Sequence, residues 1–251
     1  NNLLLILGVG GSVAAFFGFL DDIKNIRASR KLIMQFLLGC WVVLLLGGGP
    51  LLFITYINVF VLISLTILFL VWIINAHNFM DGIDGMATSG AVFVFGTMSL
   101  VLFLTSGNVS LILIFMLLLS SVGAFMFFNW PPASIFMGDS GSIFLGYTFG
   151  SLILITIESG DISVWSWLIV FSYFFADTTV TQIMRIILVK KWYKAHRSHA
   201  YQNLARITKS HLKITKGVML YNVLWILPLA LWSAFHPQTA LLATVLAIVP
   251  G

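Results

Sequence analysis

Long apolar runs alternate with short polar segments along the chain, and this pattern predicts helices that cross a membrane. A helix needs roughly 20 mostly apolar residues to span the hydrocarbon core of a bilayer. The expected spans are 2–20, 32–47, 57–75, 86–105, 109–128, 142–157, 164–184, 217–235 and a shorter run that starts at 239. The expected fold class is therefore all-α, a polytopic transmembrane helical bundle that forms a single integral membrane domain over 1–251.

Lysine and arginine are confined to two of the connections between these spans. Four lie in the first connection, 21–31, and the other nine of the 13 lie between Arg185 and Lys216. Six expected spans separate the two connections, so both lie on one side, and the positive-inside rule makes that side cytoplasmic. The same parity places the connections 75–85, 129–141 and 185–216 on the cytoplasmic side.

Composition narrows the class further. The chain is 60% hydrophobic and 8% charged, whereas soluble domains are about 25% charged. This difference excludes an ordinary soluble enzyme, a disordered tail and a nucleic-acid binder. The single cysteine, Cys40, excludes a disulfide framework and a cysteine zinc site. Since the chain starts at Asn1 and stops soon after its last apolar run begins, we expect it to be a fragment.

Most acidic residues collect at the predicted cytoplasmic ends of spans. Asp21 and Asp22 end the first span, and Asn75, Asn78, Asp81 and Asp84 follow the third within ten residues. On a helix Asn78, Asp81 and Asp84 would share one polar face. The alternatives are a charged membrane boundary for the aspartate pair and a polar helix cap for the longer motif. Asp177, inside the seventh span, is either a site residue or a partner of Arg185.

Two further motifs carry polar chemistry on the same side. Asp139 lies in Gly138-Asp-Ser-Gly-Ser142, where small residues let backbone amides approach a phosphate. His196, Arg197 and His199 lie in the basic connection, and arginine and histidine suit phosphate oxygens. The alternatives are a plain turn for the first motif and, for the second, basic residues that face anionic lipid.

Several carboxylates gathered at one face repel one another, and a divalent cation relieves that repulsion. Aspartate and asparagine oxygens without cysteine favour Mg²⁺, with Mn²⁺ as the alternative. Together with arginine and histidine, such a site fits phosphoryl transfer between a nucleotide and a lipid substrate. The competing class is a cation-coupled transporter, because membrane carboxylates also mark ion paths.

These motifs, in this order, resemble the polyprenyl-phosphate N-acetylhexosamine-1-phosphate transferase family (glycosyltransferase family 4). The resemblance implies about ten or eleven spans, two of them upstream of this fragment, in the bacterial inner membrane with a cytoplasmic active site. It also implies transfer of a sugar-1-phosphate from a UDP-N-acetylhexosamine to undecaprenyl phosphate, with release of UMP. Family relatives include homodimers. The His196-Arg-Ser-His199 sequence resembles the branch that initiates O-antigen and other surface glycans, rather than the muramyl-pentapeptide branch.

The same resemblance implies a role for each candidate residue. Asn78 and Asp139 would hold magnesium, Asp84 would accept the uracil N3–H and Phe136 would stack on the ring. The substrate contacts would also include Asn75, His196, Arg197 and His199, with the last three on the pyrophosphate and sugar. The catalytic residues would be Asp21, Asp22, Asp81 and His199. Asp21 or Asp22 would meet the lipid phosphate, and Asp81 the metal shell or its orientation. The expected mechanism is direct attack of the lipid phosphate on the β-phosphorus. In the family an aspartate of the pair is the proposed base, but a base is not essential, because the second pKa of a phosphate monoester is about 6. Asp21 or Asp22 is then alternatively an outer-shell metal ligand or a residue that orients a lysine or arginine.

Overall fold

The computed structural model describes residues 2–48, 58–188 and 198–249, and the regular structure over these residues is helical. Seven helical stretches in this part of the chain are long and apolar enough to cross a membrane. They are Asn2–Lys24, Ala28–Leu45, Val59–Phe79, Met86–Leu104, Val109–Asn129, Gly138–Glu158 and His211–Phe235. The expected polytopic helical membrane bundle is confirmed.

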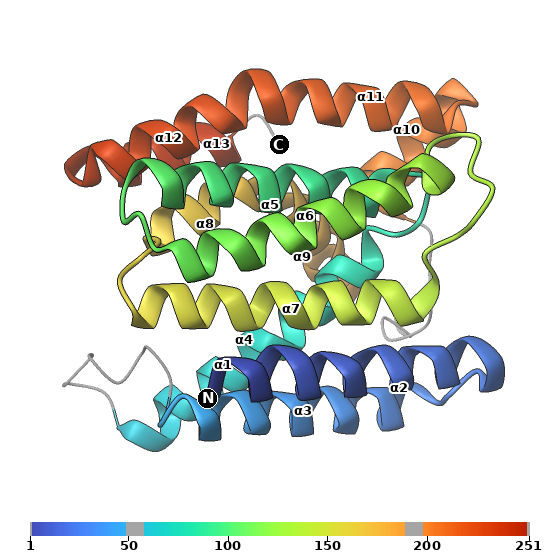
Figure 1. Cartoon of the computed structure of the whole chain (residues 1–251). Helices are drawn as coiled ribbons and strands as arrows, with labels where there is room; N and C mark the ends of the chain where they lie inside the picture. The colour runs from blue at the N-terminus through green and yellow to red at the C-terminus, as the bar shows by residue number, and fades with distance from the viewer. Residues whose placement is uncertain (1, 49–57, 189–197, 250–251) are drawn as a thin grey trace. The chain divides into compact units, whose positions relative to one another are not determined.

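Figure 1 labels these stretches in chain order. The first contains α1 (Asn2–Leu4), the π-helical turn η1 (Leu5–Gly10) and α2 (Gly11–Lys24). It is followed by α3 (Ala28–Leu45), α4 (Val59–Phe79), α5 (Met86–Leu104), α6 (Val109–Asn129) and α7 (Gly138–Glu158). The last long stretch contains α11 (His211–Tyr221), the π-helical turn η3 (Asn222–Ile226) and α12 (Leu227–Phe235). Shorter helices include α10 (Ala200–Thr208), η4 (Pro237–Thr239) and α13 (Ala240–Ile248).

The span expected at 164–184 is divided into two helices, α8 (Val164–Val170) and α9 (Ser172–Leu188). Phe171 separates them with φ −92° and ψ 4°, values that depart from the regular helix. Each piece is shorter than the roughly 20 residues that a span needs. The sidedness predicted above therefore requires α8 and α9 to cross the membrane together.

The chain divides into two compact units, which are described separately. The first unit comprises residues 1–78 and 137–160, and the second comprises 79–136 and 161–251. In the first unit α2 and α7 pack along each other. Gly18 on α2 allows this approach, because a Cβ there would lie 2.3 Å from the Asp139 carbonyl oxygen. Small residues serve close helix packing in the same way elsewhere in membranes.

The π-helical turn in the first unit accepts a hydrogen bond from α7. The Tyr147 hydroxyl on α7 donates a 2.9 Å hydrogen bond to the Ile6 carbonyl within η1. Gly10 leaves room for this ring, since a Cβ at Gly10 would lie 1.9 Å from the tyrosine oxygen. Ile6 and Tyr147 belong to a buried apolar cluster with Leu38 and Leu70. This packing keeps α7, and with it Asp139, close to α2.

Aromatic side chains form much of the core of the second unit. Phe95 on α5 meets Phe115 on α6, with their ring centroids 6.1 Å apart. Phe115 in turn lies 6.1 Å from Trp167 on α8, and Trp167 stacks on Phe171 at the helix break. Such rings bury large apolar areas, so they join α5, α6 and α8 in one core. α10 and α11 also pack on each other within this unit.

The polar stripe expected from Asn78 to Asp84 does not form, because α4 ends at Phe79. Asp81 and Asp84 lie in the following turn, which closes at Gly85 with a positive φ of 72°. Glycine adopts this left-handed conformation readily. The prediction of one helical face is therefore wrong for Asp81 and Asp84, although Asn75 and Asn78 do lie on α4.

Candidate active site

In the first unit, Asn78 and Asp139 lie against each other. The Asn78 Nδ2 atom donates to Asp139 Oδ1 at 2.9 Å and to Ser142 Oγ at 2.8 Å. Asn78 comes from the end of α4, whereas Asp139 and Ser142 come from the first turn of α7. The structure thus brings together the two residues that the sequence analysis assigned to magnesium.

Lys31 joins Asp139 to Asp21. Its Nζ atom lies 2.9 Å from Asp139 Oδ2 and also forms an ion pair with Asp21 Oδ2. Asp21 is 2% exposed, so Lys31 balances a buried charge. We call Asp21, Lys31, Asn78 and Asp139 the carboxylate–lysine cluster. The sequence analysis placed Lys31 only among the basic loop residues. The available signal was Gln35, a second polar residue one turn later on the same face of α3.

Asp22 caps α7. Its Oδ1 atom accepts from the Asp139 amide at 2.8 Å, and its Oδ2 atom accepts from the Ser140 amide at 3.0 Å. A carboxylate at a helix N-terminus satisfies amides that have no partner within the helix. Gly138 makes the approach feasible, because a Cβ there would lie 2.9 Å from Asp22 Oδ2. The adjacent aspartates therefore have different partners: Asp21 pairs with Lys31 and accepts from the Ile26 amide at 2.7 Å, whereas Asp22 accepts from two amides of α7.

Asn75, which we expected at the substrate, has a protein partner one turn before Asn78. Its Nδ2 atom donates to Gln35 Oε1 at 2.7 Å and to the Val71 carbonyl at 2.7 Å. Gln35 is 4% exposed, and an unpaired amide would be costly there. Within the first unit, Asn75 thus ties α4 to α3, on which Lys31 also lies.

The second unit carries Asp84 and its neighbours. Asp84 Oδ2 accepts from the Ala133 amide at 3.2 Å, and Asp84 Oδ1 lies 3.3 Å from His211 Nδ1. The Thr215 hydroxyl donates to the Asp84 carbonyl at 2.9 Å. His211 is not among the candidate residues expected from the sequence, because its place in the basic connection carried no sign of this contact. The contacts fix Asp84 between the 130–136 segment and the start of α11.

Tyr201 links the turn that carries Asp81 and Asp84 to α10. Its hydroxyl donates to the Phe79 carbonyl at 2.6 Å and accepts from the Gly82 amide at 3.0 Å and from Gln202 Nε2 at 3.2 Å. Burial raises the pKa of the Tyr201 hydroxyl above its usual range, so it remains a donor at neutral pH. We call Phe79, Gly82, Tyr201 and Gln202 the tyrosine joint. It fixes the backbone on both sides of Asp81.

The remaining candidates lie in or near the second unit's loops. His199, immediately before α10, is 1% exposed and stacks on Phe79 with a centroid distance of 5.7 Å. Phe136 is 74% exposed, which leaves its ring face accessible for stacking on a planar group. His196 and Arg197 lie outside the described residues, so their predicted contacts stay predictions.

The donor set of the first unit fits a hard divalent cation. Asp139 contributes a carboxylate, and Asn78 keeps its carbonyl oxygen after its amide nitrogen has donated to Asp139 and Ser142. Oxygen atoms of these two kinds are the ligands that Mg²⁺ takes in proteins. Over the described ranges, no group of three or more acidic, histidine or cysteine side chains forms a ready cage. Mg²⁺ commonly binds one or two carboxylates and completes its shell with water and substrate phosphates.

The fold and these residues together define a polytopic helical membrane protein with polar groups suited to phosphate and metal chemistry. The comparisons with known proteins then identify the family. The sequence model of glycosyl transferase family 4 matches residues 4–157, and the chain belongs to this family.

Named relatives support the same assignment. A Bacillus subtilis protein named probable undecaprenyl-phosphate N-acetylglucosaminyl 1-phosphate transferase is 31% identical over 212 residues, covering 81% of this chain and 58% of that protein. The phospho-N-acetylmuramoyl-pentapeptide-transferase of Lactobacillus delbrueckii subsp. bulgaricus is 34% identical over 191 residues, covering 70% and 56%. The enzyme of the same name from Lactobacillus helveticus is 32% identical over 202 residues, covering 74% and 61%. The chain thus spans less than two thirds of the length of these relatives.

Proposed function

We propose that the full protein transfers an N-acetylhexosamine-1-phosphate from a UDP-sugar to undecaprenyl phosphate and releases UMP. The observation that carries this proposal is the contact between Asn78 and Asp139, flanked by Lys31, in a member of glycosyl transferase family 4. Amide and carboxylate oxygens beside a lysine suit a magnesium-bound pyrophosphate. The name of the Bacillus subtilis relative supports the choice of lipid and of an N-acetylhexosamine.

Mg²⁺ would be held by Asn78 and Asp139. When bound, it would neutralise charge on the pyrophosphate and on the departing UMP. Lys31 already links Asp139 to Asp21, so its ammonium group can move toward substrate phosphate while Asp21 keeps it close. Asp22 holds the first turn of α7 and thereby orients Asp139.

The lipid phosphate supplies its own nucleophile. A phosphate monoester has a second pKa of about 6, so its oxygen is mostly ionised at neutral pH. An aspartate with an ordinary pKa of about 4 would gain little by removing that proton. Positioning and charge neutralisation should therefore supply most of the acceleration. This argument favours Asp21 as a residue that orients Lys31.

The second unit would recognise the nucleotide and sugar. Asp84 would accept the uracil N3–H and Phe136 would stack on the base, while His196, Arg197 and His199 would contact the pyrophosphate and sugar. Asp81, between the two Tyr201 contacts at Phe79 and Gly82, would complete the outer metal shell. The His196-Arg-Ser-His199 sequence favours a transferase that initiates O-antigen or another surface glycan. UDP-N-acetylglucosamine is the first sugar to test.

The proposed location is the bacterial inner membrane, with the active site on the cytoplasmic face. Cysteine labelling of the full protein in a Cys40→Ser background tests it. Lys209→Cys should react with an impermeant maleimide only after the membrane is permeabilised, and Ser106→Cys should react in intact spheroplasts. The reverse pattern would invert the topology, and labelling of both from one side would show that α8 and α9 do not cross together.

The activity test follows UMP release by the full-length protein from UDP-N-acetylglucosamine, undecaprenyl phosphate and Mg²⁺. Release should require the lipid and the metal, and Asp139→Asn should lower it at least 100-fold. Glu158→Gln, at the opposite end of α7, is the matched control and should stay within twofold. If several UDP-N-acetylhexosamines give no UMP while an active relative works in the same assay, the transferase proposal is wrong. Metal-dependent ion flux through the purified protein would then favour the transporter alternative.

A further inference from the structure

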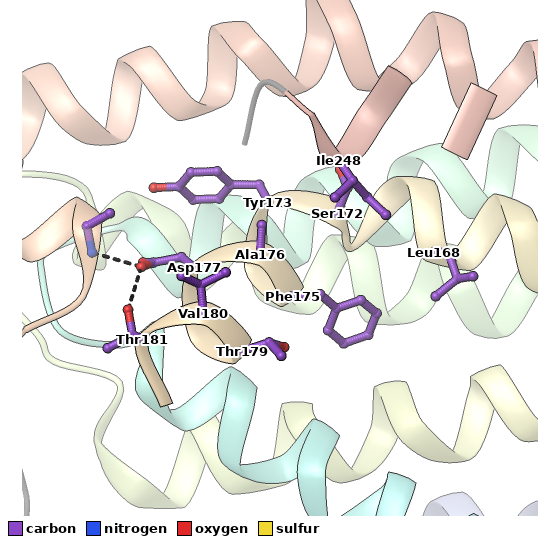
Figure 2. Close-up of a pocket in the computed structure, with 11 residues that line it drawn as sticks. Leu168, Ser172, Tyr173, Phe175, Ala176, Asp177, Thr179, Val180, Thr181 and Ile248 are labelled. Atoms are coloured by element: carbon purple, nitrogen blue, oxygen red, sulfur yellow. Dashed lines mark hydrogen bonds between the residues drawn. The ribbon is translucent and has the colours of Figure 1, made fainter. Parts of the chain in front are cut away.

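Asp177 in α9 lies against the start of α10. It belongs to none of the sequence motifs, and the proposed reaction gives it no role. Its Oδ1 atom accepts from the Ala200 amide at 2.8 Å and from the Thr181 hydroxyl at 3.2 Å (Figure 2). The same oxygen lies 3.7 Å from His199 Nδ1. This distance is longer than a hydrogen bond, and the contact becomes an ion pair when the imidazole is protonated. Asp177 therefore holds the backbone immediately after His199 and also faces its ring.

The contact between Asp177 and His199 is buried. The side chains of His199 and Asp177 are 1% and 4% exposed, and charges interact more strongly away from water. Asp177 also lines a cavity of about 510 Å³ whose other described lining residues are uncharged, among them Leu168, Tyr173 and Phe175. These residues offer the carboxylate no counter-charge. Among the hydrogen-bond and ion-pair partners of Asp177 in the described part of the chain, only His199 has a side chain that can carry a positive charge.

The ring of His199 is also restrained on other sides. Phe79 stacks on it with centroids 5.7 Å apart, and Tyr201 stacks on it with centroids 5.9 Å apart. The backbone amide of His199 donates to Gln202 Oε1 at 3.4 Å. Aromatic stacking restricts the tilt of the ring, whereas the carboxylate selects which ring edge faces α9. His199 is thus held by both the tyrosine joint and Asp177.

We propose that Asp177 is a positioning residue that holds His199 in the orientation needed for sugar-1-phosphate transfer. The proposal rests on the proposed function, because it requires His199 to contact the pyrophosphate or sugar. Asp177 would not touch substrate. Its carboxylate would hold one edge of the imidazole while the other edge remains directed at the substrate. Buried carboxylates commonly orient functional imidazoles in this way.

The test is a double-mutant cycle on UMP release by the full-length protein. Asp177→Asn keeps an oxygen for the Ala200 amide but removes the negative charge that faces His199. We expect it to lower kcat at least tenfold and to change KM for the UDP-sugar less than threefold. In a His199→Ala background the same substitution should change kcat less than twofold, because its effect passes through His199. Thr181→Val, which removes a bond to the same oxygen but keeps the charge, should stay within twofold of the unsubstituted protein.

Two kinetic results would overturn the proposal. One is an unchanged kcat in Asp177→Asn, which would show that Asp177 acts only as a helix cap. The other is an equal loss in the His199→Ala background, which would show an effect that bypasses His199. If the unsubstituted protein releases no UMP, the proposed function fails instead.

Amide hydrogen exchange over 198–205 tests the anchor without any activity. Asp177→Ala should accelerate exchange at the start of α10 at least tenfold, while Asp177→Asn should leave it near the original rate. Unchanged exchange in Asp177→Ala would show that Asp177 does not hold this segment, and the proposal would be wrong whatever the activity.

Discussion

The carboxylate–lysine cluster and the tyrosine joint hold functional residues by different forces. In the cluster, the positive charge of Lys31 offsets the negative charges of Asp21 and Asp139, so the attraction between opposite charges holds the arrangement together. In the joint, one neutral hydroxyl satisfies a carbonyl, an amide and a side-chain amide. Charged contacts can exchange partners when a phosphate or metal arrives, whereas buried neutral hydrogen bonds favour one geometry. We infer that the cluster in the first unit is adaptable and that the joint in the second unit is rigid.

The largest expected effect comes from Lys31→Gln. Because Asp21 would keep a buried charge without its counter-ion, we expect a loss of about 3 kcal/mol in the free energy of unfolding. Denaturation in mixed micelles measures it. Lys24→Gln, an exposed lysine at the end of α2, is the control and should change little. Adding Asp21→Asn to Lys31→Gln should restore part of the loss, and no recovery would show that the ion pair is not its source.

Tyr201→Phe tests the joint and should cost about 2 kcal/mol, because the Phe79 carbonyl and the Gly82 amide lose their shared partner. Unlike the Lys31 effect, this loss should be nearly independent of ionic strength, since no charge is removed. Tyr221→Phe is the comparison, because that hydroxyl makes one 3.0 Å bond to the Ala247 carbonyl. Equal losses in the two variants would argue against the joint as a special restraint.

Gly18→Ala disturbs the cluster without changing any of its polar groups. The new methyl would lie 2.3 Å from the Asp139 carbonyl oxygen and 2.6 Å from the Ser140 Cα, so α2 and α7 must separate. Overpacking of this kind costs about 1–2 kcal/mol, and we expect at least a tenfold loss of UMP release. Gly123→Ala on α6 meets nothing within 4 Å and is the control. Full activity in Gly18→Ala would show that the α2–α7 spacing does not control Asp139.

The smallest expected effect is that of Thr215→Val. It removes one 2.9 Å bond to the Asp84 carbonyl, which should cost about 1 kcal/mol. Because Asp84 would shift slightly, KM for the UDP-sugar should rise about threefold with little change in kcat, as expected for lost ground-state binding. Thr208→Val, whose hydroxyl bonds within α10, should leave KM unchanged. A fall in kcat with an unchanged KM would show that Asp84 does not take part in nucleotide binding.

Much of the fold could be predicted because membrane spans follow from local composition. The apolar runs at 109–128 and 142–157 lie within long helices of the structure, and those at 32–47, 57–75 and 86–105 overlap the helices Ala28–Leu45, Val59–Phe79 and Met86–Leu104. The run at 164–184 was interpreted wrongly as one helix, since hydrophobicity alone does not register the break at Phe171. The end of α4 was also missed, because polar residues at helical spacing give the same sequence pattern whether they lie on a helix or in a turn.

The residues of the candidate site likewise divide into those that the sequence indicated and those that it did not. Asn78 and Asp139 were selected from their residue types and motifs, and they do lie in contact. Lys31 and His211 were passed over, because basic residues near a membrane have an ordinary explanation in anionic lipid. Their partners lie on other helices or, for His211, in the turn that follows α4, and neither spacing nor periodicity can indicate such contacts.

The sequence by itself determined the membrane class and most spans, because each depends on residue type and local order, and the metal role of Asn78 and Asp139 stays a prediction from the family resemblance. Only the tertiary structure decided that Asp21 pairs with Lys31, that Asp22 caps α7 and that Tyr201 holds the turn around Asp81. Lys31 and Asp139 are 108 residues apart, and Tyr201 and Phe79 are 122 apart. Contacts at such separations depend on how helices pack, and helix packing depends on the complementary shapes of several segments at once.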